Sequence, residues 1–361
     1  MKNSTLFFVV LFSICTTIQA QNVLIVDNNQ GSGAQYTTLQ TAVDAANPDD
    51  IIYIQPSPNS YGDVYMKKPL KIYGIGHNPQ LNAGQYARVS SVLFRNANAS
   101  GSQISGLYIS NIYLDDTNYS NHDIVITNNR LYTVYGNSHT GRANNVIISG
   151  NFFYHNSSRA LDNYNSQNWI ISNNTFSRPN SYWGYDIFYR LNSSTIFNNN
   201  IILSRQAGDS NGAITLFNSC SGTQLTNNIF IFTGNNVENF NLGGNSALNF
   251  QHNLTYSYNS TLDALSGTNN INNTDPQFVA FNPNTSLNST ANDYHIQGGS
   301  PAEDAGTDGN DLGVFNGAYP FSLRGYPTQL PYLTDFVIHN NIITAGTPLN
   351  INIKANANIN N

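Results

Sequence analysis

Residues 144–176 read NNVIISGNFFYHNSSRALDNYNSQNWIISNNTF and contain one short pattern twice. Two alternating apolar residues, an asparagine and an aromatic residue occur first at Val146, Ile148, Asn151 and Phe153, and 23 residues later at Trp169, Ile171, Asn174 and Phe176. A repeat of this length, made of short strands and turns, is typical of solenoids, in which each repeat packs only on its neighbours. The stretch therefore predicts a coiled, repetitive fold.

The asparagine of this pattern recurs through the middle of the chain at intervals of 22 to 28 residues, at Asn129, Asn151, Asn174, Asn200, Asn228 and Asn253. Strands of neighbouring coils lie about 4.8 Å apart. An asparagine turned inward at each bend can pass amide hydrogen bonds from coil to coil, and asparagine tolerates left-handed backbone. We therefore expect these asparagines to be structural and exclude them from the candidate site.

The residues before the repeats predict a cap. A strand is expected at 23–26, an amphipathic helix over 37–46 that Asn47-Pro48 ends, and further strands at 51–54 and 70–74. A solenoid needs such a cap, because an open coil end would expose core side chains and unpaired strand edges.

Three phrases follow the repeats, namely DPQFV at 275–279, GSPAEDAG at 299–306 and DLGVF at 311–315. Together with the cap, they resemble the secreted bacterial right-handed parallel β-helix proteins of the pectin-lyase-like superfamily, although Val314 replaces the usual small residue. The resemblance covers about residues 23–320. It implies an architecture and says little about activity, because one fold hosts many chemistries.

We therefore predict an all-β chain, a right-handed parallel β-helix solenoid with an N-terminal αβ cap. The expected parts are a signal peptide (1–20), the strand–helix–strand cap and first coil (21–90), the coils (91–280), a closing segment (281–322) and a β-rich tail (323–361). The sequence leaves the packing of the tail open.

The first twenty residues have the features of a secretory signal peptide, with Lys2 before an apolar run at 6–14 and a cleavage point after Ala20. This predicts a secreted or cell-surface protein, and no other apolar run is long enough to span a membrane. Only Cys220 would remain in the mature chain, so we expect no internal disulfide and an idle, buried thiol. With 14 Lys and Arg residues and net charge −6, the chain lacks the basic surface that nucleic-acid binding requires.

Two reaction classes are common among folds of this kind. A glycoside hydrolase needs two carboxylates at a defined separation, and the only paired aspartates in the coils, Asp115-Asp116, stand alone. A lyase acting on a uronate needs a cation or Ca²⁺ at the carboxylate and a base beside the proton, and the coils contain no lysine. If the protein is an enzyme, elimination by a polysaccharide lyase is favoured over hydrolysis.

The candidate catalytic residues follow successive asparagines by four or five positions and are His155, Arg178 and Arg205. We expect them on one edge of adjacent coils, where like charges repel by about 1 kcal/mol and would favour a bound anion. In an elimination, an arginine would hold the uronate carboxylate, and His155 or a tyrosine would act as the base.

Aromatic and charged residues on the same loops are candidate substrate-binding groups, because rings stack on sugar faces and charges bond to hydroxyl or carboxylate groups. They are Arg159, Asp162, Tyr182, Trp183, Tyr185, Asp186, Tyr189, Arg190 and Asp209. The alternative is that the arginines pair with these aspartates as surface salt bridges.

Asp304, Asp308 and Asp311 form an acidic, glycine-containing cluster, which offers oxygen ligands for Ca²⁺ or, alternatively, a turn with side-chain hydrogen bonds. Ca²⁺ is the one cofactor for which ligands can be named. We expect an extracellular carbohydrate-active protein that binds an acidic polysaccharide or cell-surface glycan, with cleavage left open. The alternative is a non-catalytic surface or adhesive β-helix protein.

Overall fold

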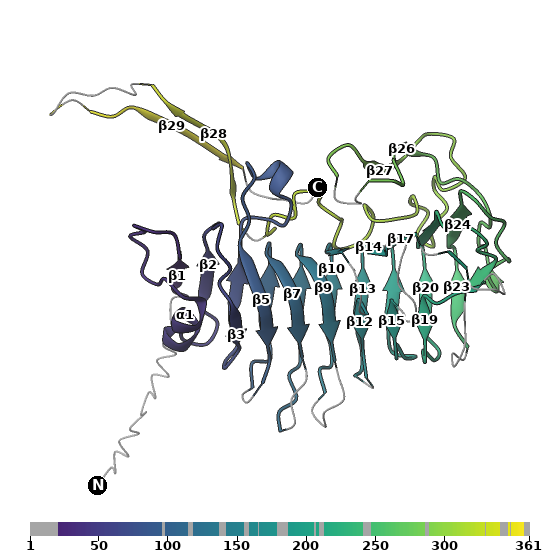
Figure 1. Ribbon diagram of the computed structural model, residues 1–361, viewed down its shortest axis with the longest axis horizontal. Helices are drawn as coiled ribbons and strands as arrows, with labels where there is room; N and C mark the ends of the chain where they lie inside the picture. The colour runs from purple at the N-terminus through teal and green to yellow at the C-terminus, as the bar shows by residue number, and fades with distance from the viewer. Residues whose placement is uncertain are drawn as a thin grey trace, which may run out of the picture.

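The computed structural model describes residues 21–361 except 96–97, 115–117, 137–141, 155–158, 165, 179–186, 206, 209–212, 241–246, 286–288, 329, 340–345, 347 and 357–361. The described chain is a parallel β-solenoid, drawn from the side in Figure 1, with very little helix. The predicted fold class is confirmed.

One side of the solenoid is an 11-stranded parallel sheet to which each coil adds one short strand. Its strands, in order, are β1 (Val23–Val26), β2 (Ile51–Ile54), β4 (Lys71–Tyr73), β6 (Gln103–Ser105), β8 (Val125–Thr127), β10 (Ile147–Ser149), β13 (Ile170–Ser172), β16 (Ile196–Asn198), β20 (Gln224–Thr226), β23 (Asn249–Gln251) and β25 (Gly267–Thr268). Its central residues, such as Ile126, Ile148 and Ile171, stack in register and point into the core.

After each turn that ends a strand of the first sheet, the chain enters a strand of a second parallel sheet. It contains β3 (Asp63–Tyr65), β5 (Arg88–Leu93), β7 (Tyr108–Tyr113), β9 (Arg130–Tyr135), β11 (Phe152–Tyr154), β14 (Thr175–Arg178), β17 (Ile201–Ser204), β21 (Ile229–Phe232) and β24 (Leu254–Ser257). The end of β9 also pairs with β12 (Leu161–Asp162), from which β15 (Phe188–Tyr189) and β19 (Phe217–Asn218) continue. A separate parallel pair joins β18 (Ala213–Ile214) to β22 (Asn239–Phe240).

Two-residue turns join the two sheets, and the second residue of each turn from Asn129 onward is one of the predicted asparagines. Its side-chain oxygen accepts a hydrogen bond of 2.9–3.0 Å from the backbone N–H at the same place one coil earlier. This asparagine ladder begins at Leu107 N and ends at Asn270, so the structural role is confirmed. The left-handed backbone falls one residue earlier than expected, for example at Asn128 and Asn173 (φ 56° for both).

The interior is filled by stacked apolar rows. Phe153 and Phe176 stack with ring centroids 4.6 Å apart, and Phe188 meets Phe176 edge-on at 4.9 Å. Such packing makes neighbouring coils depend on one another for burial of their apolar area. The thiol of Cys220 is buried, as predicted.

The N-terminal cap is built around α1 (Leu39–Ala45), which contacts β1, β2 and β3. Thr38 caps the helix by accepting from the N–H of Thr41, and Leu39, Ala42 and Val43 are buried. Further along, a short 3-10 helix, η1 (Pro79–Leu81), interrupts the chain between β4 and β5.

The segment after the last coil covers the side of the solenoid. The antiparallel pair β26 (Phe278–Ala280) and β27 (Asp293–Ile296) belongs to a second core with outward-facing residues of β17, β21 and β24. Residues 305–327, here called the return segment, then run back over the turns between the two sheets. Asn227 bonds to Thr307, Asn173 to the carbonyl of Val314, and Asn128 to the carbonyl of Tyr326.

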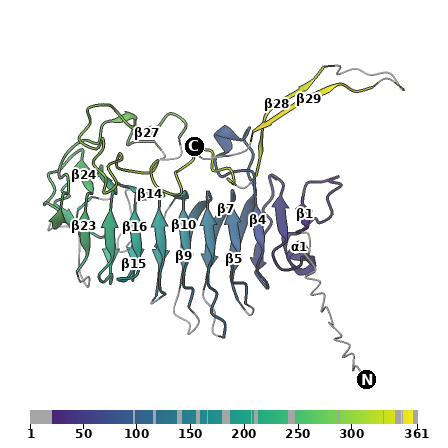
Figure 2. The same cartoon turned by 180° about the vertical axis from the view of Figure 1, so that it is seen from behind.

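The tail forms an antiparallel hairpin of β28 (Tyr332–Ile338) and β29 (Ile351–Asn356). Figure 1 and Figure 2 show it projecting away from the coils near their N-terminal end. All six residues of β29 are exposed. In the described part of the chain, no helix is long and apolar enough to cross a membrane.

Candidate functional site

Arg178 and Arg205, two of the candidate catalytic residues, do not lie side by side. Arg178 pairs in register with Ser204, so Arg205 stands one residue further and faces the other side of the sheet. Arg178 is almost fully buried (3% exposed), and its guanidinium donates to the carbonyl of Thr215. Arg178 follows Asn174 by four residues and Arg205 follows Asn200 by five, so the two charges face opposite sides of the sheet.

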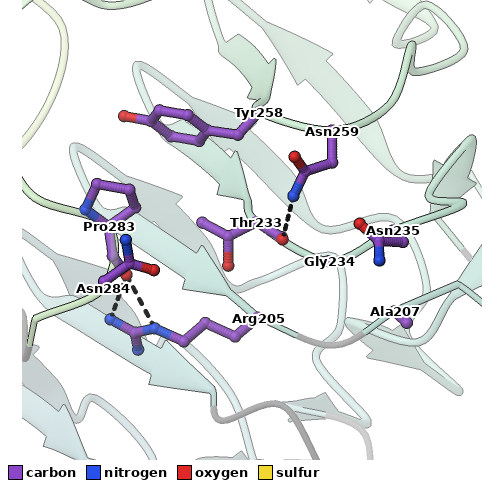
Figure 3. A pocket seen from close by; sticks show the side chains of 9 residues that line it. All are labelled: Arg205, Ala207, Thr233, Gly234, Asn235, Tyr258, Asn259, Pro283 and Asn284. Atoms are coloured by element: carbon purple, nitrogen blue, oxygen red, sulfur yellow. Dashed lines mark hydrogen bonds between the residues drawn. The ribbon is translucent and has the colours of Figure 1, made fainter.

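Arg205 binds the chain segment that covers the coils. Its Nε and Nη2 donate to the carbonyl of Pro283 at 3.0 and 2.8 Å, Nη2 also donates to Thr285, and Nη1 donates to the hydroxyl of Ser177 at 3.0 Å. Figure 3 shows the guanidinium directed at Pro283 across a recess of about 480 Å³ that Tyr258 also lines. Arg205 thus lies beside a concavity, with its donors already engaged.

Four of the candidate binding residues do gather, at the edge formed by β12 and β15. Arg190 forms a bidentate pair with Asp162 at 2.8 and 2.5 Å, and Arg159 lies 3.6 Å from the same carboxylate. The Arg159 guanidinium stacks 3.4 Å from the centroid of Tyr189. The carboxylate is buried and shared by two cations, which agrees with the salt-bridge alternative.

Six other candidates lie outside the described residues: His155, Tyr182, Trp183, Tyr185, Asp186 and Asp209. Their roles stay predictions.

The acidic cluster is used for turns. Asp311 accepts from the backbone N–H of Asp304, and Asp308 accepts from Asn310. Among the described residues, no group of three or more His, Cys, Asp or Glu side chains is placed to hold a metal ion. A Ca²⁺ site at Asp304, Asp308 and Asp311 stays a prediction.

A different set of residues forms a continuous row on the outer face of the second sheet, over β5, β7, β9 and β11. Arg88, Tyr108 and Arg130 are neighbours in register, and Tyr132 and Tyr154 follow two residues further along β9 and β11. Tyr86 precedes β5 and continues the row. We call this set the arginine–tyrosine stripe: Tyr86, Arg88, Tyr108, Arg130, Tyr132 and Tyr154.

The rings of the stripe step regularly from coil to coil. The distance between ring centroids is 5.7 Å from Tyr86 to Tyr108, 6.1 Å from Tyr108 to Tyr132 and 6.2 Å from Tyr132 to Tyr154. The Arg130 guanidinium lies 4.7 Å from the centroid of Tyr108 and 5.1 Å from that of Tyr154. All six side chains are half-buried, so each ring is held in place and keeps an exposed part.

Within the described residues, no carboxylate neutralises the charge of the stripe. In the described part of the chain, neither Arg88 nor Arg130 has a carboxylate within ion-pair distance, and the Nε atoms of both are buried without an acceptor. Both side chains are instead held by aromatic rings. The stripe is therefore a cationic, aromatic surface with no anion of its own.

The stripe ends in a recess of about 390 Å³. Arg130 and Tyr154 form part of its lining, together with Asn78, Pro79 and Gln80 of η1 and with Thr285 and Ser289. Beneath it His77 is fully buried, with neither ring nitrogen hydrogen-bonded, and burial followed by the charge of Arg130 lowers its pKa to about 3. Burial and the hydroxyl contact with Tyr108 raise the pKa of Tyr132 to about 12.

Sequence reasoning missed the stripe because it looked at the loops after β11. A signal was present in the residue that directly follows each turn between the sheets. In the earlier coils this residue is Tyr108 or Arg130, and in the later coils the same position holds Phe152, Thr175 and Ile201. That row changes from cationic and aromatic to apolar along the solenoid.

The described chain thus belongs to the class of capped parallel β-solenoids. A comparison with protein-family models and with curated proteins finds no match. Among solved structures, the chain is similar to PfbA, a surface adhesin of Streptococcus pneumoniae, with a TM-score of 0.36 and 12% identity over 63% of this chain and 76% of that one.

Proposed function

We propose that this protein is an extracellular β-solenoid that binds an acidic polysaccharide along the arginine–tyrosine stripe without cleaving it. The observation that carries the proposal is the pair Arg88 and Arg130, which lack carboxylate partners and stand among exposed tyrosine edges. The extracellular location rests on the predicted signal peptide at residues 1–20, which lie outside the described residues.

The chemistry of the stripe suits an anionic sugar polymer. Tyrosine rings offer flat apolar faces to sugar rings, and guanidinium groups bond to carboxylates through paired donors. Each coil of the stripe contributes a tyrosine and alternate coils contribute an arginine, so a linear polymer can make the same kinds of contact more than once. Repeated weak contacts of this kind add up to useful affinity when one chain engages them together.

Binding is favoured over cleavage by the titration of the nearby groups. A general base works best with a pKa near the operating pH. Burial raises the pKa of Tyr132 to about 12, so it stays protonated at neutral pH. His77 is unprotonated at that pH but fully buried, out of contact with a ligand on the surface.

The test is a binding titration with polygalacturonate and alginate, and with dextran as an uncharged polymer. The double variant Arg88→Ala/Arg130→Ala should weaken polyuronate binding by about tenfold or more per arginine, because each loses a charge-assisted contact of about 1.5–3 kcal/mol. The double variant Lys67→Ala/Lys71→Ala removes the same charge on the cap and on β4, outside the stripe, and should bind like the wild type.

Two results would contradict the proposal. One is equal binding by the stripe variant and the charge-matched control. The other is release of unsaturated uronate products, seen as ultraviolet absorbance during incubation with polygalacturonate or alginate, which would restore the lyase interpretation.

A further inference from the structure

We infer that the stripe recognises the end of an acidic polysaccharide chain and not a stretch within it. The inference rests on the proposed function and adds a specificity to it. It is carried by the shape of the stripe, which is open at Tyr86 and closed beyond Tyr154.

The closed end follows from what happens on the next two strands. The outward positions that continue the stripe are Thr175 and Ser177 on β14, and Ile201 and Leu203 on β17. None of the four is more than 3% exposed. A cover containing Phe278, Tyr294 and Phe321 forms the second core there, so a polymer cannot continue along the row.

Arg205 fixes the edge of this cover directly next to the stripe. Its guanidinium joins Ser177, the next outward position after Tyr154, to the carbonyls of Pro283 and Thr285. Figure 3 shows the part of this contact that joins Arg205 to Pro283, with Asn284 next to it. The arginine named from sequence as a catalytic candidate is here a positioning residue that holds the wall.

The recess at Arg130 and Tyr154 has a second wall. Asn78, Pro79 and Gln80 line it from η1, and the Gln80 side-chain oxygen accepts from the backbone N–H of Thr290 at 3.1 Å. Thr285 and Ser289 line the side formed by the cover. A terminal uronate fits this place, with its carboxylate at Arg130 and its ring beside Tyr154.

The other end of the stripe is open. Tyr86 lines a recess of about 510 Å³ together with Pro58, Gly84 and Gln85, which are all exposed. The remainder of the polymer can leave over Arg88 and Tyr86 toward the cap. The stripe therefore has room for a chain that begins at the wall and extends in one direction.

The experiment counts binding sites on polygalacturonate fractions of three mean lengths, by isothermal titration calorimetry with the intact wild-type protein. Chain-end recognition predicts one protein per polymer chain at every length. At equal mass of polymer, capacity should then rise in proportion to the number of chain ends, and tetramers should compete with the polymer at equal molar concentration of chains.

The outcomes separate the inference from the function on which it rests. If the number of proteins bound per chain grows with chain length, the stripe binds internal stretches, and chain-end recognition is wrong while glycan binding stands. If no fraction binds at all, the proposed function itself fails. The count needs no variant, so a misfolded mutant cannot obscure it.

Discussion

At the scale of single residues, the asparagine ladder explains why a chain with only 9% charged residues can bury so many amides. The Asn174 oxygen accepts from both the backbone N–H and the side-chain amide of Asn151, and its own amide donates to the carbonyl of Ile148. Buried polar groups are stable only when hydrogen-bonded, so each rung satisfies groups that its neighbours leave open.

Asn174→Ala should therefore lower the free energy of unfolding by roughly 2–4 kcal/mol, because it leaves the backbone N–H of Asn151 without its acceptor and removes one bond from the Asn151 amide and one to the carbonyl of Ile148. Urea unfolding followed by circular dichroism measures the change. Asn59→Ala, at an exposed turn, is the control and should stay within about 0.5 kcal/mol of the wild type. Equal effects at the two positions would show that the ladder contributes no particular stability.

His77 predicts a pH dependence of stability. Burial, then the nearby Arg130, lowers its folded pKa to about 3, whereas the ordinary value is 6.5. Between these values the unfolded chain binds a proton that the folded chain excludes. Stability from this residue is therefore complete above pH 6.5 and falls as the pH drops toward 3, by about 1.4 kcal/mol per pH unit.

Comparison of the wild type with His77→Leu isolates this contribution from the carboxylates that also titrate. Unfolding free energies between pH 7.5 and 4.5 should fall less steeply for the variant, and the difference between the two curves should grow as the pH is lowered. Parallel curves would mean that the histidine is solvated in the folded state.

Residue roles were predictable where they follow the repeat and not where they depend on distant contacts. The ladder asparagines follow a fixed spacing, so their role could be predicted from sequence. The environment of His77 depends on Phe321 and Gly325, which the return segment brings onto it from the other end of the chain. No local pattern signals such a contact.

At the scale of elements, the return segment packs closely on the coils, and its tightest point is at Gly325. Gly325 has a left-handed backbone (φ 63°), and a Cβ there would overlap the ring of His77. Gly299 also has a left-handed backbone (φ 84°) but has open space around it. Comparing alanine variants of Gly325 and Gly299 therefore distinguishes the cost of left-handed backbone from the cost of steric overlap.

Gly325→Ala should lower stability well beyond the 1–2 kcal/mol that left-handed backbone costs an L-residue, and it should loosen the return segment. Gly299→Ala should show the backbone cost alone. Thermal unfolding together with limited proteolysis distinguishes them, since only Gly325→Ala should speed cleavage within residues 305–327. If both variants behave alike, the contact with His77 is not tight.

The elements of the cap and coils were predictable because their apolar periods are local. The strands at 23–26 and 51–54 were predicted at the bounds at which they are found, and the helix of the cap within a few residues. The side of the sheet that Arg205 faces was predicted wrongly, because Arg205 lies one residue further along its strand than Arg178 does, and neighbouring residues of a strand face opposite sides. The arginine–tyrosine stripe was not predicted either, because its prediction requires knowing which outward-facing rows the chain after the coils covers.

At the scale of the whole molecule, the return segment changes the kind of solenoid this is. In an uncovered solenoid each coil contacts only its neighbours, so stability is a sum of local terms and unfolding can proceed coil by coil. Here one segment touches turns from Asn227 back to Asn128. Such contacts join distant coils, and we expect the coils and the cover to unfold as one cooperative unit.

The left-handed asparagines of the turns allow a test that preserves the backbone. Asn128→Gly, Asn173→Gly and Asn227→Gly keep the positive φ but remove the side-chain bonds to the return segment. The triple variant should lose about 1 kcal/mol per deleted contact, and its denaturant transition should broaden as the cover detaches before the coils. With the second tryptophan, Trp183, replaced by Phe in every protein compared, the fluorescence of Trp169 reports on the coils, because its side chain is buried there.

Asn199→Gly is the matched control, since Asn199 occupies the same left-handed position (φ 55°) and no hydrogen bond from its side chain to the return segment is present. It should unfold in one sharp transition, with circular dichroism and fluorescence coinciding. A triple variant that melts as sharply as Asn199→Gly would show that the coils need no cover to act together.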